Sequence, residues 1–272
     1  METAMIGLLA ETAIHPGAGR GLGVVDLPVA REAATDYPVL MGSGLKGALR
    51  DKARSLGGID TRVSFGRQDA AGDLLVSDGR LLLLPVRSLT SSYRWITSPH
   101  VIERYRRDLA RAGLADDLSV PEVARGSVLA AGKGSLFLEE RQFSNTGQPQ
   151  PDIADDIGRM VLHDETRARL ARQIAILNDD DFAWFVRYGL SVQARNVLEE
   201  RTKKSNDLWY EETLPPDTVM YALIAGRSAE ALDVLEALFP DGDSYLQVGG
   251  NETIGQGWFA VKARRTEMAG VK

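Results

Sequence analysis

Short apolar runs and amphipathic stretches follow one another along this chain. The predominantly apolar runs, which are typical of buried strands, lie at residues 4–13, with a short polar interruption, and at 80–86 and 219–225. Apolar residues at helical spacing predict helices over 45–56, 98–112, 153–177, 179–189 and 229–239. The alternation lacks the regular strand–helix spacing of a doubly wound sheet. It therefore predicts an α+β fold, a split βαβ unit of ferredoxin type with insertions.

Two regions stand apart from this core pattern. Residues 191–198 and 208–214 are strand-like and enclose a charged segment, which predicts a projecting hairpin over 196–216. Residues 114–180 begin irregularly, with short strands near Ser127–Ala130 and Ser135–Leu138, and are predicted to form an insertion region. No long-period repeat and no low-complexity linker interrupts the chain, so we expect a single domain over 1–272.

The composition narrows the choice of function. The chain has 272 residues and no cysteine, which excludes a disulfide framework and a thiolate metal site. The net charge of −6 argues mildly against nucleic acid as a partner, but the acidic residues concentrate at 152–164 and 179–181. A locally basic groove elsewhere stays compatible with that charge. We find no signal peptide and no apolar run long enough for a bilayer, so we expect a cytoplasmic protein without membrane contact.

A glycine-rich segment leads into the first predicted helix. Ser43 follows an apolar run and is placed to act as N-cap, between Gly42 and Gly44. Lys46 and Arg50 recur on one face, apart from the apolar stripe. Free N–H groups, the positive end of a helix dipole and a lysine together favour an anion, most naturally a phosphate. The alternative is an ordinary capped helix with a solvated basic face.

A second glycine-rich segment precedes it. Glycines alternate with other residues from Gly17 to Gly23 around Arg20, which suits a flexible or anion-cradling loop. The spacing fits neither G-x-G-x-x-G nor the P-loop pattern, so a nucleotide-cofactor enzyme is weakly supported. His15 and Asp26 flank this loop. A lone histidine is more often a packing residue than a catalytic one, and an aspartate in this context is more often a turn residue.

Four stretches together carry a family resemblance. Gly42-Ser43-Gly44-Leu45-Lys46-Gly47-Ala48-Leu49-Arg50 resembles the G-S-S-L-K-G-x-L-R signature of the RAMP superfamily of CRISPR proteins. The resemblance continues over residues 23–32, 81–88 and 249–257. The set, in that order, is similar to the Cas7-like backbone subunits of type III-B (Cmr) effector complexes. Gly44 stands where the superfamily usually has a second serine, so one possible hydroxyl contact is absent.

This resemblance implies a fold and a set of RNA contacts. It implies a ferredoxin-like (RRM-like) RAMP core with insertions, in which the hairpin over 196–216 acts as a thumb. We also expect the loop at 249–257 to lie beside the helix that follows Ser43, where its glycines would let backbone N–H groups approach RNA; the alternative is a hairpin turn between two strands. The residues that we expect to bind RNA are Arg20, Ser43, Lys46, Arg50, Gly249, Gly250, Gly255 and Gly257.

The resemblance further implies a reaction. Asp26 aligns with the aspartate that cleaves target RNA in this family. Because His15 lies close in sequence on the same glycine-rich segment, we expect it to assist. We expect a metal-dependent endoribonuclease that acts within the assembled complex. In it, attack by the 2′-OH would leave a 2′,3′-cyclic phosphate, and Asp26 would hold Mg²⁺ or another divalent cation.

The implied partners are nucleic acid and protein. They are the guide crRNA, the target RNA, further copies of the chain in a helical filament, and the other Cmr subunits (Cmr1, Cmr2, Cmr3, Cmr5 and Cmr6). The leading hypothesis is a guide-binding subunit that cuts the paired target at regular intervals. The alternative is a non-catalytic crRNA-binding subunit of a type III complex, and Asp26 discriminates between the two.

Overall fold

Four antiparallel strands form the centre of the computed structural model, which describes residues 1–21, 23–114, 117–228, 230–240 and 242–266. They are β1 (Glu2–Ala10), β6 (Gly79–Arg87), β14 (Val219–Gly226) and β16 (Trp258–Arg264). Their order across the sheet is β16–β1–β14–β6. With α1 (Gly42–Leu56) after the first strand and α7 (Asp233–Leu238) before the last, this is the split βαβ arrangement. The expected ferredoxin-like α+β core is therefore confirmed.

The sheet continues well beyond this core. Among the described residues it holds 12 strands in all, with β15 (Tyr245–Gln247) at one edge, and β2 (Val39–Leu40) and β5 (Leu74–Val76) as short additions. Beyond β6 it continues through β7 (Tyr93–Thr97), β11 (Ile174–Leu177), β8 (Ser127–Ala130), β10 (Arg141–Gly147) and β9 (Ser135–Leu138). The region 114–180 thus adds its strands to the same sheet. Every residue of β14 is buried, because the strand is central and covered on both faces.

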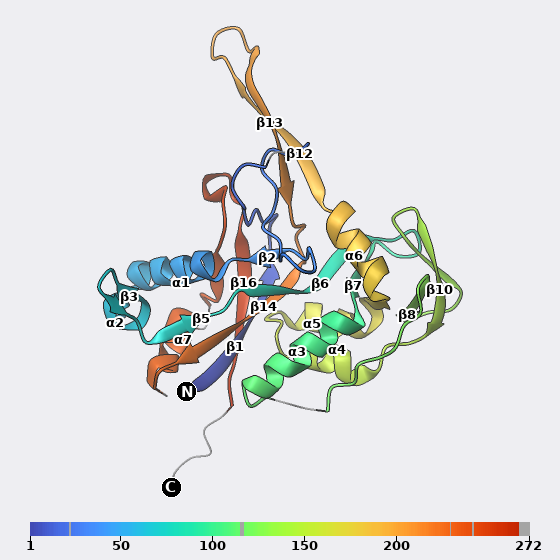
Figure 1. Ribbon diagram of the computed structural model, residues 1–272, viewed down its shortest axis with the longest axis horizontal. Coiled ribbons are helices and arrows are strands. Elements are labelled where there is room, and N and C mark those ends of the chain that lie inside the picture. Colours follow the sequence, from blue (N-terminus) through green and yellow to red (C-terminus); the bar gives the residue numbers. More distant parts are fainter. Residues whose placement is uncertain (22, 115–116, 229, 241, 267–272) are drawn as a thin grey trace.

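The helices gather on two sides of the central strands (Figure 1). α1 and α7 lie on one side together with α2 (Thr61–Phe65) and the ribbon of β3 (Gly66–Arg67) and β4 (Ala70–Ala71). On the other side lie α3 (Pro99–Arg111), α4 (Pro151–Gly158), α5 (Asp164–Gln173) and α6 (Asp179–Tyr188). α7 follows a 3-10 turn at Glu230–Leu232, and residue 229, where we predicted the start of this helix, lies outside the described residues.

The predicted single helix over 153–177 is wrong, because it is interrupted between Gly158 and Asp164 and ends at Gln173. The chain forms α4 and α5 and then turns at Ile174 into the strand β11, which pairs with β7 and β8. All four residues of β11 are buried. A short run that is apolar on both faces suits a central strand as well as a helix, and here the pairing with two neighbouring strands decides.

Two buried tyrosines tie α3 to the sheet. Tyr221 of β14 donates a hydrogen bond to Asp108 of α3 at 2.8 Å. Tyr105 of α3 donates to Asp156 of α4 at 2.8 Å, and Arg264 of β16 pairs with the same carboxylate at 3.0 Å. Burial raises the pKa of both tyrosines, so each stays a protonated donor.

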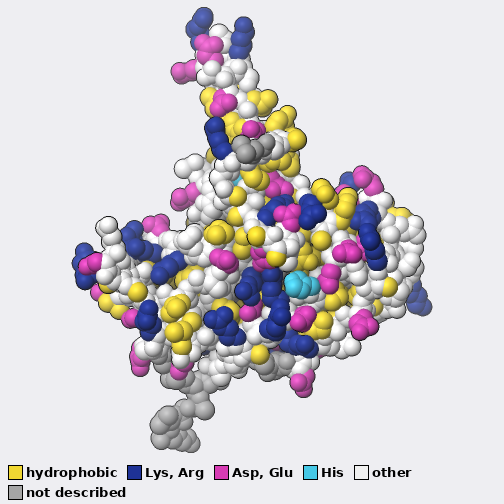
Figure 2. All heavy atoms as spheres, in the orientation of Figure 1, with side chains coloured by type: hydrophobic (Ala, Val, Ile, Leu, Met, Phe, Trp, Pro, Cys, Tyr) yellow, Lys and Arg dark blue, Asp and Glu magenta, His cyan; other side chains and the backbone are white. Residues whose placement is uncertain are grey.

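A long hairpin projects from this body (Figure 1). It consists of β12 (Ser191–Leu198) and β13 (Ser205–Thr213), so the predicted limits of 196–216 are wrong and its first strand starts five residues earlier. Apolar side chains follow its shaft and charges of both signs occupy its tip, as Figure 2 shows. Val192, Val197, Leu198, Leu208 and Tyr210 are all more than 40% exposed. No described helix is both long and apolar enough to span a membrane.

Candidate active site

Asp26 lies against the root of the hairpin. Leu27 pairs with β13 through two backbone hydrogen bonds, from its N–H to the Tyr210 carbonyl and to its carbonyl from the Glu212 N–H, both at 3.0 Å. The Asp26 side chain accepts a third hydrogen bond, from the Tyr210 N–H to Oδ2 at 2.8 Å. This carboxylate, which the sequence singled out, is thereby held half-buried at the point where the hairpin leaves the body.

His15 reaches the same strand from the other side of the loop. Ile14 pairs with Leu214 just beyond the end of β13, at 3.0 and 2.9 Å, which brings the neighbouring histidine under the hairpin. His15 Nδ1 lies 2.8 Å from the Glu212 carbonyl oxygen. A carbonyl can only accept, so Nδ1 carries the proton, and Nε2 of the neutral ring is an acceptor. A Cβ at Gly17 would lie 2.9 Å from Nε2, so glycine there leaves room for the ring.

Two buried glutamates complete the site. Glu212 accepts from Arg31 at 2.8 Å and from the Val29 N–H at 3.1 Å, which fixes the segment that carries Asp26. Glu211, the next residue of β13, accepts from the Asn251 amide, and its carboxylate lies 3.9 Å from His15 Nδ1 and 3.7 Å from Arg195 Nε. Both glutamates are less than a tenth exposed. We call His15, Asp26, Arg31, Glu211, Glu212 and Asn251 the hairpin-root cluster.

Neither glutamate was predicted from the sequence. Adjacent residues of a strand face opposite sides, so a pair of carboxylates directly after an apolar and aromatic stretch leaves one of them facing the protein interior. A buried carboxylate requires partners, and those partners come from residues 29–31 and 251, which no local pattern connects to β13. The one available signal was the position of the pair in a predicted strand.

The glycine-rich loop after β15 packs on the histidine. The Gly250 N–H donates to the His15 carbonyl at 3.0 Å, and the Gly257 N–H donates to the Ala13 carbonyl at 3.0 Å. Gly249 has a φ of +96°, and a Cβ there would lie 2.6 Å from the His15 carbonyl oxygen. Gly249 and Gly250 therefore allow close packing inside the protein, whereas Gly255 borders open space.

The start of α1 differs from the prediction. Ser43 is not the N-cap; Met41 occupies that position, and Ser43 is an exposed residue of the first turn. The Gly42 N–H is satisfied by Asp78 Oδ1 at 2.7 Å, from the turn before β6. A Cβ at Gly42 would lie 3.0 Å from the Val76 carbonyl oxygen. Glycine thus lets the helix begin against this turn, which supplies the cap that we assigned to Ser43.

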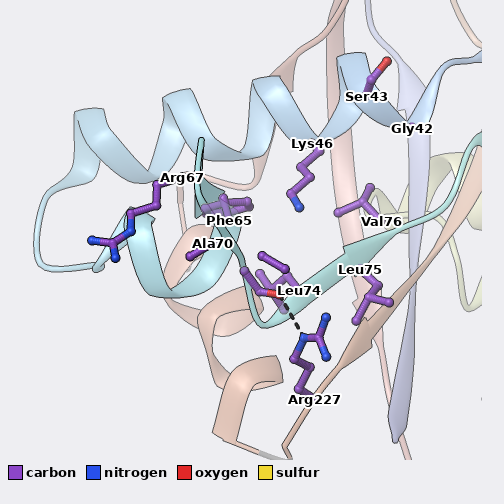
Figure 3. Close-up of a pocket in the computed structure, with 12 residues that line it drawn as sticks. Gly42, Ser43, Lys46, Phe65, Arg67, Ala70, Leu74, Leu75, Val76 and Arg227 are labelled. Carbon is purple, nitrogen blue, oxygen red and sulfur yellow. Dashed lines mark hydrogen bonds between the residues drawn. The ribbon is translucent and has the colours of Figure 1, made fainter.

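Two cavities flank α1. One, of about 610 Å³, lies between α1 and the glycine-rich loop, as expected for that loop. Its lining includes Gly44, Gly47, Tyr245, Gly249 and Trp258. The other, of about 440 Å³, lies on a different face of α1 and includes Lys46 (Figure 3). Lys46 and the glycine-rich loop therefore do not share one cavity.

The remaining predicted contacts are scattered. Arg50 is half-buried on α1, and its Nε has no hydrogen-bond partner in the part of the chain that the structure describes. Arg20 is exposed on the loop between His15 and Asp26. The structure thus brings His15, Asp26, Gly249 and Gly250 to one place and leaves Ser43, Lys46 and Arg50 along α1.

The site offers a metal ion few ligands. Within the described ranges, no three histidine, aspartate or glutamate side chains come together as a metal cage. Asp26 has one oxygen bonded to Tyr210, and no protein donor reaches the other within those ranges. Magnesium keeps several waters and accepts one or two carboxylates plus phosphate oxygens, so Asp26 fits it as a single ligand beside RNA.

Comparisons with known proteins agree with this architecture. The model of the RAMP superfamily matches residues 8–260. The CRISPR system Cmr endoribonuclease Cmr4 of Pyrococcus furiosus is 32% identical over 99% of this chain and 98% of its own. The crystal structure of oligomeric Cmr4 from that organism superposes with a TM-score of 0.78 and 28% identity, over 98% of this chain and 99% of the other.

A more distant structure shares the fold. A chain of the type III-B Cmr-beta complex bound to cognate target RNA has a TM-score of 0.75 at 18% identity, and each chain is covered over 97%. The match to the family model and the identity along nearly the whole length agree in their assignment. This chain belongs to the RAMP superfamily and, within it, to the Cmr4 family.

Proposed function

We propose that this chain is a repeated backbone subunit of a type III-B Cmr effector complex, which holds guide crRNA and cleaves the paired target RNA. Its Cmr4 relative is named an endoribonuclease, and a more distant structural relative is one chain of a complex bound to cognate target RNA. One observation of this molecule supports the reaction above the rest. Asp26 and His15, eleven residues apart, both attach to β13 at the root of the exposed hairpin.

The protein's contribution is chiefly one of position. The attacking group is the 2′-OH next to the scissile phosphate, and it must lie in line with the leaving 5′ oxygen. A hairpin that projects between base pairs would splay the nucleotide at its root, beside Asp26. The free oxygen of Asp26 would accept the 2′-OH proton or orient a hydrated cation, while the Tyr210 N–H holds the other oxygen.

His15 would act from a fixed orientation. Its Nδ1–H is engaged with Glu212, so rotation of the ring is restrained and Nε2 is the acceptor. Because His15 is only 8% exposed, we assign it to positioning at the site rather than to direct attack. A bound Mg²⁺ would supply charge neutralisation at the phosphate.

Substitution of Asp26 by asparagine tests the proposal. Asp26→Asn keeps the shape and removes the charge, so the assembled complex should lose cleavage about 10²–10⁴-fold. Guide and target binding should stay unchanged in filter binding. Asp164→Asn, at an exposed carboxylate of α5 outside the hairpin-root cluster, is the matched control.

Product ends and substrate chemistry provide the second readout. The products should carry a 2′,3′-cyclic phosphate and a 5′-hydroxyl, and a 2′-deoxy nucleotide at the cut should block the reaction. If the Asp26→Asn complex cuts at the wild-type rate, the assignment of this carboxylate is wrong. A complex that binds RNA but never cuts would instead support the non-catalytic subunit.

A further inference from the structure

The cavity beneath α1 has a rigid wall. Figure 3 shows it enclosed by the start of α1, the end of α2, the β3–β4 ribbon, β5 and Arg227, which follows β14. Phe65 and Leu74 are buried and form its apolar floor. A Cβ at Gly72 would lie 2.3 Å from the Gly66 backbone nitrogen, so the ribbon is close-packed where it borders the cavity. The wall is thus held in place before any ligand enters.

Two cations face this cavity without a counter-ion. Lys46 makes no hydrogen bond and no ion pair with any described residue, and Figure 3 shows its amine directed from α1 into the cavity. Arg227 extends from the opposite wall (Figure 3), and its Nε donates to the Gly72 carbonyl at 3.2 Å. The two terminal nitrogens of that guanidinium have no acceptor among the described residues. Among the described residues that line the cavity, none carries a carboxylate.

A third cation on the rim provides a contrast. Arg67 pairs with Asp69 at 2.9 Å, and Figure 3 shows it turned outward from the centre of the cavity. Its charge is compensated by a residue next to it. Lys46 and Arg227, which have no counter-ion among the described residues, both point into the cavity, whereas the paired Arg67 points away from it (Figure 3).

The chemistry of the lining favours a phosphate. A tetrahedral phosphate presents several charged oxygens, which can accept from cations on opposite walls at once, whereas a carboxylate presents two. Ser43 and Gly44 lie in the first turn of α1, and their N–H groups have no acceptor among the described residues, so the helix end adds favourable dipole charge. Arg227 is anchored through its backbone N–H to the Asp73 carbonyl at 3.0 Å, which limits the entropy lost on binding.

We propose that this cavity binds one phosphate group between Lys46 and Arg227. The group is either a backbone phosphate of RNA or a free phosphate, as in inorganic phosphate or a mononucleotide. The RNA source rests on the proposed function; the free source does not. In either case Arg227 is a ligand that the sequence pattern did not mark, because its cationic partner lies 181 positions away.

A double-mutant cycle tests whether one group is shared. Binding of a labelled single-stranded RNA is measured by fluorescence anisotropy at several salt concentrations for the wild-type chain, Lys46→Ala, Arg227→Ala and the double variant. Each single change should weaken binding about tenfold, as loss of a charge-assisted contact does. The double variant should be hardly weaker than either single one, because both cations hold the same phosphate. For each single variant, the slope of the logarithm of the RNA association constant against the logarithm of the salt concentration should become less negative by about 0.7.

Matched controls separate this site from general charge effects. Arg67→Ala and Lys52→Ala each remove a cation that is already paired, at 2.9 Å from Asp69 and from Asp243, and should change binding less than twofold. Arg227→Lys keeps the charge and should restore part of the affinity. If Arg227→Ala unfolds the chain, Arg227→Gln keeps a donor for the Gly72 carbonyl and takes its place in the cycle.

Free phosphate distinguishes the two sources. Inorganic phosphate and adenosine monophosphate are titrated against the same variants, and the thermal midpoint is measured. Stabilisation of wild type but not of the double variant assigns a free-phosphate site, and an effect with RNA alone assigns the backbone source. Wild-type affinity of Arg227→Ala for every probe, or strictly additive losses, would overturn the proposal. Either result would leave the proposal of RNA cleavage at Asp26 untouched, so the phosphate site and the cleavage reaction can be disproved separately.

Discussion

The hairpin-root cluster and the cavity beneath α1 handle charge in opposite ways. In the cluster each buried charge already has a partner: Glu212 holds Arg31, and Glu211 accepts from Asn251. In the cavity Lys46 and Arg227 face the same space with no acid in its lining. A buried charge that is paired within the protein fixes the geometry of its neighbours. Lys46 is half-buried and Arg227 exposed, and two such cations on one cavity, without a counter-ion in the part of the chain that the structure describes, can bind an anion.

The glycines also fall into two groups, those that pack inside the protein and those that border open space. Gly17, Gly249 and Gly250 touch His15, so they serve packing within the protein. Gly44 and Gly47 have open space where a side chain would stand, on the cavity that α1 shares with the glycine-rich loop. Glycine content alone therefore does not mark an RNA contact, and the neighbours of each glycine decide.

Removal of Glu212 should have the largest effect on stability. Glu212→Ala leaves Arg31 without its carboxylate and the Val29 N–H without an acceptor in a buried setting. The free energy of unfolding in urea should fall by about 3–5 kcal/mol. Glu139→Ala, which breaks the exposed pair with Arg87, should cost less than about 1 kcal/mol. Lys46→Ala should lower the free energy of unfolding about as little. If Lys46→Ala and Glu212→Ala lowered it equally, the contrast between paired and unpaired charges would be wrong.

A side chain at Gly249 should act next most strongly. Gly249→Ala places a Cβ 2.6 Å from the His15 carbonyl oxygen at a φ of +96°, so we expect about 2–3 kcal/mol of destabilisation. Cleavage should fall more than guide binding, because His15 moves. Gly255→Ala, at a φ of +79° with open space around it, should cost about 1 kcal/mol and spare cleavage. Both are read by urea unfolding and a cleavage assay, and a larger effect at Gly255 would contradict this account.

The elements that the sequence predicted well are those set by local pattern. The apolar stripe of Leu45 and Leu49 gives α1, Gly57 ends it, and the apolar runs give β6 and β14. The ferredoxin-like order and the existence of the hairpin follow from the succession of such elements. Asp26 and His15 entered through family resemblance, and the structure brings them to one strand.

What the sequence could not supply depends on contacts between distant segments. β11 is a strand because β7 and β8 pair with it, although its residues also continue a helical stripe. The cap of α1 comes from Asp78, 36 positions from Gly42, and not from Ser43. Arg227 and Lys46 line the same cavity because β14 pairs with β5, which places the end of β14 near the start of α1. The strand β11, the cap of α1 and the position of Arg227 each depend on a contact with a distant segment, which the hydrophobic pattern of a single segment does not reveal.

Neutralisation of Asp78 should have the smallest effect of the three changes, and it should lower stability while raising RNA affinity. Asp78 accepts from the Gly42 N–H at the end of α1 that borders the cationic cavity, yet it is not part of the cavity lining. Asp78→Asn keeps an acceptor and removes a negative charge near the phosphate site, so stability should fall by about 0.3–1 kcal/mol. RNA affinity at low salt should rise about two- to fivefold, and the gain should shrink as salt screens the charge.

Asp60→Asn, which alters the corresponding cap of α2, is the control. Asp60 accepts from the backbone N–H groups of Arg62 and Val63, so its change should lower stability without raising RNA affinity. Unfolding and anisotropy measured on the same samples separate the two signs. A loss of RNA affinity in Asp78→Asn would mean that the cap, rather than the charge of the cavity, governs this end of α1.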